Sequence, residues 1–365
     1  MFQKLLNKKL FAVVSLLMLI VAGLNACTSA PIYRGEASQH FNGSVFANHI
    51  KSDKSPWDIV KLFTRFEFYK ESWPDFIEND TSVASPVLER SKALRVTFIN
   101  HSSFLVQVDN LNILTDPIYA NRASPFSWAG PARVRLPGLA LEALPPIDVV
   151  LISHNHYDHL DIETLKKLYQ QQQGSEPLII SGLGNGGLFL DEGLGQFKDL
   201  DWNQSVTHKG TTFTFVETRH RSGRGISDQM KTLWGGFVIE SSKGPIYFAG
   251  DTGYGPHFAD THQRFGDFYL SLLPIGAYEP RWFMKAVHLN PEEAVLAHMD
   301  LHSANSISMH FGTFQLTYEG VGQPEIDLGV ALEKHNIEAD RFQVTIRLSI
   351  LTLQEHLANY LFPPG

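Results

Sequence analysis

Three histidines and an aspartate lie within six positions of the stretch LISHNHYDHLD at 151–161. His154, His156, Asp158 and His159 follow directly on an apolar run that predicts a buried strand. Imidazole and carboxylate groups are suitable ligands for Zn²⁺ and similar divalent metals, and burying so many ionisable groups without a metal would be costly. We therefore interpret this stretch as part of a metal site, in a tight loop that leaves the strand.

Two metal ions need more ligands than one loop supplies, and the later sequence offers three more. His220 in TFVETRHRSG, Asp251 in YFAGDTGYG and His310 in SISMHFG each come at or just past the end of an apolar run. Because strand ends can meet along one edge of a sheet, we expect these three side chains to lie close to the first four.

Short apolar or alternating segments predict many strands, and amphipathic segments between them predict helices. The expected helices span 161–172, with Asp161 as a plausible N-cap, 291–302 and 326–336. The expected strands span 94–100, 103–109, 112–116, 146–153, 177–182, 211–218, 233–241, 245–251, 268–276 and 306–311. This alternation favours an α/β layered domain.

The pattern H-x-H-x-D-H, followed by the later His, Asp and His, resembles the metallo-β-lactamase superfamily. Longer segments resemble the family of N-acyl-phosphatidylethanolamine-hydrolysing phospholipases D, and the resemblance covers roughly residues 93–345. It implies a metallo-β-lactamase-like αββα sandwich with an N-terminal helical extension, and a site along one edge of the two sheets. The segments that carry it are FINHSSFLVQVDNLNILTDPIYANRASP (98–125), LPPIDVVLISHNHYDHLD (144–161), FAGDTGY (248–254) and LPIGAYEPRWFMKAVHLNPEEAV (273–295).

The resemblance also implies a role for each residue of the site. It assigns His154, His156 and His220 to a first metal, Asp158, His159 and His310 to a second, and Asp251 to both, with Asp158 and Asp251 as catalytic carboxylates. Tyr157 and His288 match positions that touch substrate, and Asp116 matches a position that supports the site loop without being a ligand. We expect His101 to be structural or to support a ligand.

The implied reaction is phospholipase D hydrolysis of N-acyl-phosphatidylethanolamine to an N-acylethanolamine and phosphatidic acid. Two divalent ions about 3.5–4 Å apart, with Zn²⁺ as the expected metal, can share a hydroxide that attacks phosphorus. Segments 174–206 and 219–223 depart from the family pattern, so the substrate pocket could differ. A lactonase or phosphodiesterase acting on a small soluble substrate in the periplasm is the alternative, and a metal-stabilised envelope lipoprotein without catalysis is a third hypothesis.

The N-terminus predicts a lipoprotein signal peptide over residues 1–26. Three lysines precede the apolar segment 11–23, and Leu24-Asn25-Ala26-Cys27 resembles a bacterial lipobox whose cysteine becomes lipidated. Thr28 favours the outer membrane over the inner, on the periplasmic side. An uncleaved anchor and an ordinary signal peptide are the alternatives.

The remaining sequence divides into a tether and aromatic-rich extension at 27–92 and a hydrolase domain at 93–365. Residues 28–45 are small and polar, whereas Ile59, Leu62, Phe63 and Phe66 form one face of a predicted helix within 56–76. That helix would either pack on the main domain or lie in a membrane interface.

The charge of the chain restricts its partners. The net charge is −8, and removing residues 1–26 makes it −11, which argues against nucleic-acid binding. A membrane phospholipid is the expected partner. The sequence leaves the oligomeric state open, and the resemblance is compatible with a dimer.

Overall fold

The computed structural model describes residues 33–50, 57–58, 61–62, 64–65, 70–79, 86–344 and 350–352. The predicted signal peptide and Cys27 lie outside these residues, as do Ile59, Phe63 and Phe66 of the predicted aromatic helix face. The division at residue 92 stays a prediction.

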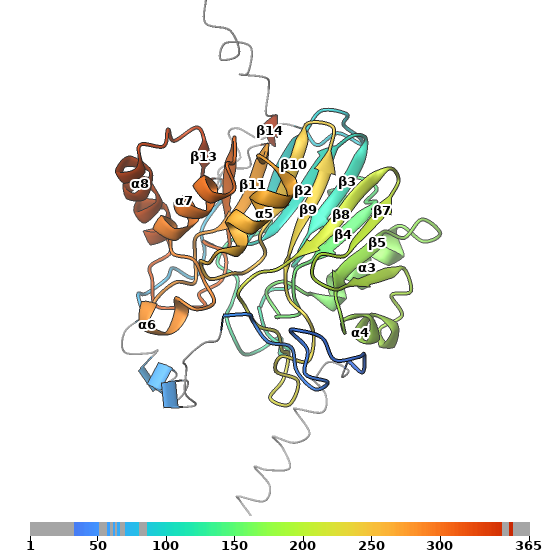
Figure 1. Cartoon of the computed structure of the whole chain (residues 1–365), viewed down its shortest axis with the longest axis horizontal. Coiled ribbons are helices and arrows are strands. Elements are labelled where there is room, and N and C mark those ends of the chain that lie inside the picture. Colours follow the sequence, from blue (N-terminus) through green and yellow to red (C-terminus); the bar gives the residue numbers. More distant parts are fainter. Residues whose placement is uncertain are drawn as a thin grey trace, which may run out of the picture.

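Within the described residues, two seven-stranded sheets pack face to face, and helices cover their outer sides (Figure 1). In order across it, the first sheet contains β14 (Ile350–Thr352), β1 (Arg95–Asn100), β2 (Ser103–Val108), β3 (Leu111–Thr115), β4 (Val149–Ile152), β5 (Leu178–Gly182) and β6 (Phe197–Leu200). The second contains β13 (Phe342–Gln343), β12 (Ser306–Met309), β11 (Leu270–Pro274), β10 (Gly244–Phe248), β9 (Gly236–Ser241), β8 (Thr211–Val216) and β7 (Ser205–His208).

The helices lie on the two outer faces of the sandwich. Helices α3 (Ile162–Gln171) and α4 (Gly186–Asp191) cover the first sheet, whereas α5 (His257–Phe265), α7 (Pro291–Asp300) and α8 (Gln323–His335) lie on the side of the second (Figure 1). A short α6 (Arg281–Met284) precedes α7, and a 3₁₀ turn spans Leu141–Ala143. The predicted αββα sandwich is thus confirmed.

Strand β4 shows why the central strands read as continuous apolar runs. Val149 and Leu151 belong to the core between the sheets, whereas Val150 and Ile152 belong to the core beneath α3, and all four are fully buried. A strand buried on both faces has no polar side, so its sequence does not alternate.

The strand directions bring the predicted ligands to one edge. β8 and β10 are both antiparallel to β9, and β10, β11 and β12 are mutually parallel, so β8, β10 and β12 all run the same way. Their carboxyl ends therefore lie together, and these are the ends that precede His220, Asp251 and His310.

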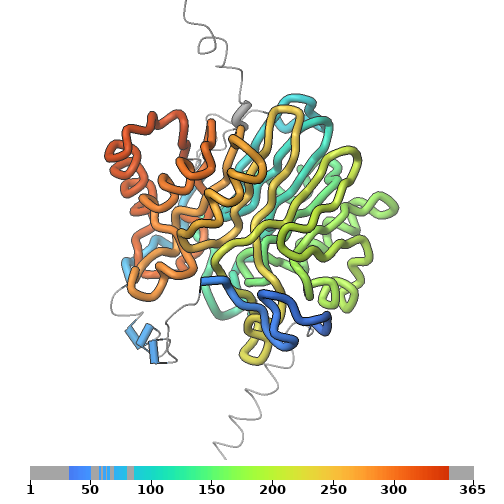
Figure 2. Tube along the Cα trace, viewed as in Figure 1, coloured from blue at the N-terminus to red at the C-terminus, as the bar shows by residue number. Residues whose placement is uncertain are grey.

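The N-terminal segment departs from its prediction. Phe41 and Phe46 are buried in the main core, and the Phe46 amide donates to the Met230 carbonyl at 2.8 Å. Interpreting residues 28–45 as a tether is therefore wrong from residue 33 onward, because the two phenylalanines bury more apolar surface than a solvated tether could. Figure 2 shows this segment (blue) beside the loop that follows β8, at one end of the sandwich.

The described part of the aromatic segment packs on the domain. The Lys61 ammonium lies 4.3 Å from the ring centroid of Trp282 in α6, and the Tyr318 hydroxyl donates to the Leu62 carbonyl at 3.1 Å. None of the helices in the described part of the chain combines the length and apolar composition that a bilayer crossing requires.

Candidate metal centre

The loop between β4 and α3 carries four of the predicted ligands. It ends at Asp161, whose side chain accepts from the Thr164 amide and so caps α3 as predicted. The Arg224 guanidinium donates to the carbonyls of Asn155 (3.0 Å) and Leu160 (2.9 Å), on either side of His156, Asp158 and His159. Both ends of the loop are therefore held, which limits the positions that its histidines can adopt.

His154, His156 and His220 form the first group. His156 Nδ1 lies 2.8 Å from His154 Nε2 and 3.2 Å from His220 Nε2. Burial lowers the pKa of His154 and His156 well below the ordinary value and that of His220 to about 4, so neutral rings are favoured. Neutral nitrogens that face one another at these distances fit three ligands of one ion.

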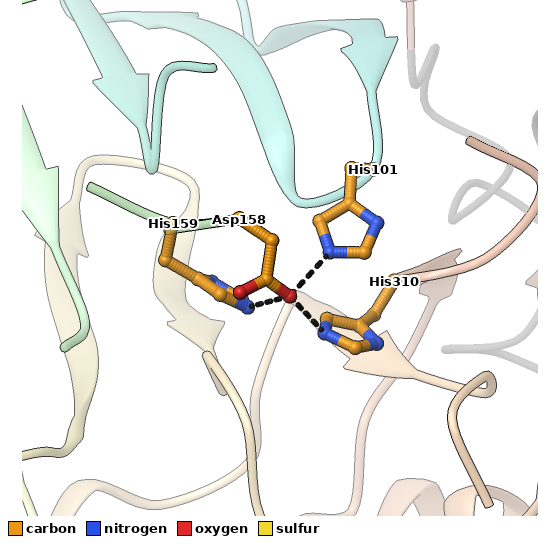
Figure 3. A group of neighbouring side chains, drawn as sticks. All are labelled: His101, Asp158, His159 and His310. Atoms are coloured by element: carbon orange, nitrogen blue, oxygen red, sulfur yellow. Dashed lines mark hydrogen bonds and ion pairs between the residues drawn. The ribbon is translucent and has the colours of Figure 1, made fainter. Parts of the chain in front are cut away.

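Asp158, His159 and His310 form the second group. Asp158 Oδ2 lies 3.3 Å from His310 Nε2 and 3.5 Å from His159 Nε2 (Figure 3). Figure 3 also shows His101 pointing at the same carboxylate, with its Nε2 at 3.1 Å from Oδ2. His101 thus contacts a predicted ligand, as expected for a supporting residue, although it approaches as closely as the ligands themselves.

Asp251 lies between the two groups. Its Oδ2 is 3.1 Å from His310 Nε2 and 3.5 Å from His220 Nε2, and its Oδ1 is 3.4 Å from His159 Nε2. The Asp251 carboxylate therefore lies within 3.5 Å of histidines from both clusters. This position suits a bridging ligand.

Hydrogen bonds behind the histidines fix their orientation. Asp116 Oδ2 accepts from His159 Nδ1 at 2.6 Å, and its two oxygens also accept from the amide and hydroxyl of Ser153. His220 Nδ1 donates to the Val287 carbonyl at 2.9 Å. In both rings Nδ1 is bound to an acceptor, so Nε2 is the nitrogen that faces the centre, the usual arrangement behind metal-binding histidines. Asp116 thus hydrogen-bonds to the start of the ligand loop and to one of its histidines.

The charges of the second group balance one another. Burial disfavours charge, yet Asp251 and Asp158 raise the pKa of His310 to about 9, and Asp251, Asp158 and Asp116 raise that of His159 well above its usual value. The same histidines hold the pKa of Asp158 and Asp251 well below normal against burial. The two carboxylates are thus ionised, as metal ligands must be.

Several buried atoms of the centre have no hydrogen-bond partner. These are Nε2 of His159, both ring nitrogens of His310 and Oδ1 of Asp251. Buried polar atoms are normally paired, and leaving them unpaired costs free energy. Imidazole nitrogens and ionised carboxylates that face one another in this way fit divalent metal ions, whose charge would replace the protons on His159 and His310, so the residues present are suited to a two-metal centre.

The backbone at His310 is shaped for close approach. His310 has φ of +61°, and its amide donates to the His101 carbonyl at 2.9 Å. A Cβ on Gly276 would lie 2.1 Å from the His310 carbonyl oxygen, so only glycine fits there. Close packing against the backbone of a predicted ligand therefore explains the glycine in PIGAYEP.

The two predicted substrate residues have different surroundings. His288 is buried, with Nδ1 3.8 Å from Asp251 Oδ2, which is close enough for it to be a further ligand. Tyr157 is half-buried under the Arg224 guanidinium, 3.9 Å from its ring centroid. Tyr157 also lines a groove of about 920 Å³, which includes Tyr119, Phe126 and Leu188 but also Arg122, Lys167, Asp191 and Glu192.

Some contributing residues were missed by the sequence reasoning. Ser153 connects Asp116 to His154, Arg224 holds the ligand loop, and Asn48 exchanges hydrogen bonds with the His220 backbone. Ser153 could have been suspected from its place between a strand and the motif. Asn48 and Arg224 carry no local signal, because only the folded chain brings them to the site.

Comparison with known proteins identifies relatives. The β-lactamase superfamily domain matches residues 111–311. An uncharacterized protein of Mycobacterium tuberculosis is 40% identical over 262 residues, which cover 70% of this chain and 69% of that protein. N-acyl-phosphatidylethanolamine-hydrolyzing phospholipase D 1 of Caenorhabditis elegans is 38% identical over 61% of this chain and 65% of its own length. The mitochondrial enzyme of that name from Saccharomyces cerevisiae is 34% identical over 65% of this chain and 51% of its own length.

Solved structures agree on the fold. A possible metal-dependent hydrolase from Veillonella parvula has a TM-score of 0.58 at 17% identity and covers 72% of this chain and 100% of its own. The metallo hydrolase Igni18 from Ignicoccus hospitalis has a TM-score of 0.53 at 20% identity, with 72% and 99% coverage. Together with the domain match and the metal-binding clusters, these likenesses show that the chain belongs to the metallo-β-lactamase superfamily.

Proposed function

We propose that this metallo-hydrolase is a phosphodiesterase of phospholipase D type that converts N-acyl-phosphatidylethanolamine to an N-acylethanolamine and phosphatidic acid. The observation that carries the proposal is the position of Asp251 between two clusters that could each hold one ion. Identities of 34% and 38% to two enzymes named for this reaction support the choice of substrate.

The reaction adds water across one phosphoester bond. Two divalent ions, with Zn²⁺ as the expected metal, would lower the pKa of water towards about 7 and neutralise charge on the phosphoryl oxygens. A hydroxyl joins phosphorus, the bond from phosphorus to the ethanolamine oxygen breaks, and that oxygen takes up a proton. Phosphatidic acid keeps the phosphate.

The residues of this chain hold and orient the reacting groups. Asp116 and Val287 fix the rings of His159 and His220, and Asp251 joins the two clusters. His288 and Tyr157 would contact substrate, one beside Asp251 and the other at the groove. The chemistry needs no protein nucleophile.

Exposed apolar side chains near site residues in the sequence favour a lipid substrate. Ile226 follows His220 by six residues, Trp128 lies in the loop that lines the groove, and Trp282 in α6 precedes His288 by six; they are 74%, 78% and 47% exposed. Exposed aromatic and apolar side chains can enter a membrane interface. A lipid anchor at Cys27, on the periplasmic side of the outer membrane, would hold the enzyme against its substrate, and Cys27→Ser should then release the protein from the membrane fraction.

The test uses zinc-loaded protein and N-acyl-phosphatidylethanolamine in mixed micelles, in water enriched in ¹⁸O. We expect both products, with the label in phosphatidic acid because the attack is on phosphorus. Asp251→Asn should lower turnover by at least about a thousandfold and weaken metal occupancy, while the protein still folds. The control Asp260→Asn, at an exposed position, should leave turnover and metal occupancy unchanged. A purely structural metal site predicts instead that Asp251→Asn fails to fold.

A small soluble substrate is the second candidate. The charged residues of the groove favour it, because a channel for acyl chains alone would be apolar. Protein that contains two metals, leaves the lipid intact under all detergent conditions and yet cleaves a lactone or a water-soluble phosphodiester would replace the first proposal with this one.

A further inference from the structure

Arg221 is a half-buried cation without an acceptor. Its Nε is buried and unpaired, and no residue in the described part of the chain accepts a hydrogen bond from its guanidinium. Partly burying a guanidinium without a counter-ion is costly, so the position calls for an explanation.

The two neighbouring arginines differ from it. Arg219 donates through Nη1 to the Tyr254 carbonyl, and Arg224 donates to two carbonyls of the ligand loop and stacks on Tyr157. These contacts give both side chains a structural purpose. Arg221, two residues from one and three from the other, makes no comparable contact.

The backbone around Arg221 runs along the ligand loop. Arg221 directly follows His220, and two residues later the Gly223 amide donates to Asn155 Oδ1 of that loop at 2.8 Å. The His220 ring lies 5.0 Å from the His288 ring, centroid to centroid. Arg221 therefore belongs to the side of the centre formed by the first group of histidines, where His288 also lies.

We propose that Arg221 forms an anion-binding subsite and that its guanidinium donates to a non-bridging phosphoryl oxygen of the substrate. Guanidinium matches phosphate oxygens with parallel hydrogen bonds, and the bound anion supplies the missing counter-charge. The substrate assignment rests on the proposed function, whereas the anion site rests on the residue itself. The segment 219–223 is one of the two that depart from the family pattern, so the subsite would be a property of this chain.

Binding of inorganic phosphate to the zinc-loaded full chain, measured by calorimetry, tests the subsite without turnover. Arg221→Gln should weaken phosphate binding at least about tenfold, and Arg221→Lys should restore part of the loss. Zinc content should not change, and the melting temperature of Arg221→Gln should stay equal or rise, because an uncompensated cation is removed. The matched control Arg219→Gln, which also removes one charge next to His220, should keep the phosphate affinity while lowering the melting temperature.

The outcomes separate the two proposals. The subsite would be overturned if Arg221→Gln bound phosphate within twofold of the parent's affinity. A lower zinc content or a lower melting temperature in that variant would overturn it as well. If phosphate binding depends on Arg221 but the lipid is not cleaved, the subsite stands and the substrate assignment fails. If Arg221→Gln and Arg221→Lys cleave the lipid with the parent's KM and bind phosphate as tightly as the parent does, only the subsite fails.

Discussion

Asp116 illustrates how a residue that is not itself a metal ligand can fix the orientation of one. It is fully buried, and its carboxylate holds both the Ser153 amide at the start of the ligand loop and the His159 ring. The orientation of His159 therefore depends on a carboxylate behind it, and His159 contacts both Asp158 and Asp251.

Asp116→Asn should weaken metal affinity about 10- to 100-fold while leaving the fold intact. An amide cannot accept from His159 and Ser153 with both of its polar atoms, so the ring loses its fixed position. Zinc affinity measured by competition with a chelator gives the result. Asp199→Asn is the matched control, because Asp199 accepts from the Gly184 and Gly186 amides, away from the centre. Equal losses of affinity in the two variants would contradict a specific role for Asp116.

At the scale of the elements, the sequence predicts best what local patterns encode. All ten predicted strands and three of the four predicted helices are present, with shifted ends such as α8, which begins at Gln323 rather than at 326. The fourth, within 56–76, lies partly outside the described residues. Apolar periodicity does not reveal the half-exposed strands β6 and β7 or the short helices α4 and α6. It also misses α5, which begins after Pro256 without a side chain that caps it.

The candidate site followed from the same logic, since each ligand closes a strand whose direction is fixed by its neighbours. The seven predicted ligands do converge, whereas their roles as metal ligands stay predictions. Residues 33–45 were misread as a tether because Phe41 is an isolated apolar residue in a polar stretch, and only the hydrophobic core of the folded chain shows that it packs there together with Phe46.

The start of α3 provides a test at this scale. Asp161 accepts from the Thr164 amide and hydroxyl and from the Ala120 amide, so it joins the helix to the loop after β3. Asp161→Ala should lower the free energy of unfolding by about 2 kcal/mol, at the upper end for a helix cap, because several donors lose their acceptor. Urea unfolding measures this, with the exposed Glu163→Ala as the control. A change of less than about 0.5 kcal/mol would show that the cap is not needed.

At the scale of the whole molecule, Asp148 connects distant parts of the chain. It precedes β4 in the first sheet and pairs with Lys209 from the turn between β7 and β8 of the second, and with Arg90 from the segment before β1. Burial would raise the pKa of Asp148, but Arg90, Lys209 and the Asn112 amide lower it below the ordinary value.

This lowered pKa predicts a pH-dependent contribution to stability. The ionised form is stabilised by folding, so the contribution is complete above the unfolded pKa of about 3.9 and is lost as the pH falls through the lower folded value. Asp148→Asn should reduce the free energy of unfolding by about 2 kcal/mol near neutral pH. The difference from the parent should shrink below about pH 4. A difference that stayed constant over that range would exclude the ion pairs as its source.

The central claim is that seven side chains from one edge of the sandwich hold two metal ions, and metal content tests it most directly. The full chain would be stripped with a chelator, reloaded with excess zinc, desalted and analysed by elemental mass spectrometry against protein concentration. We expect about two zinc ions per chain, as a two-metal hydrolase requires. One ion or fewer in correctly folded protein would contradict the claim.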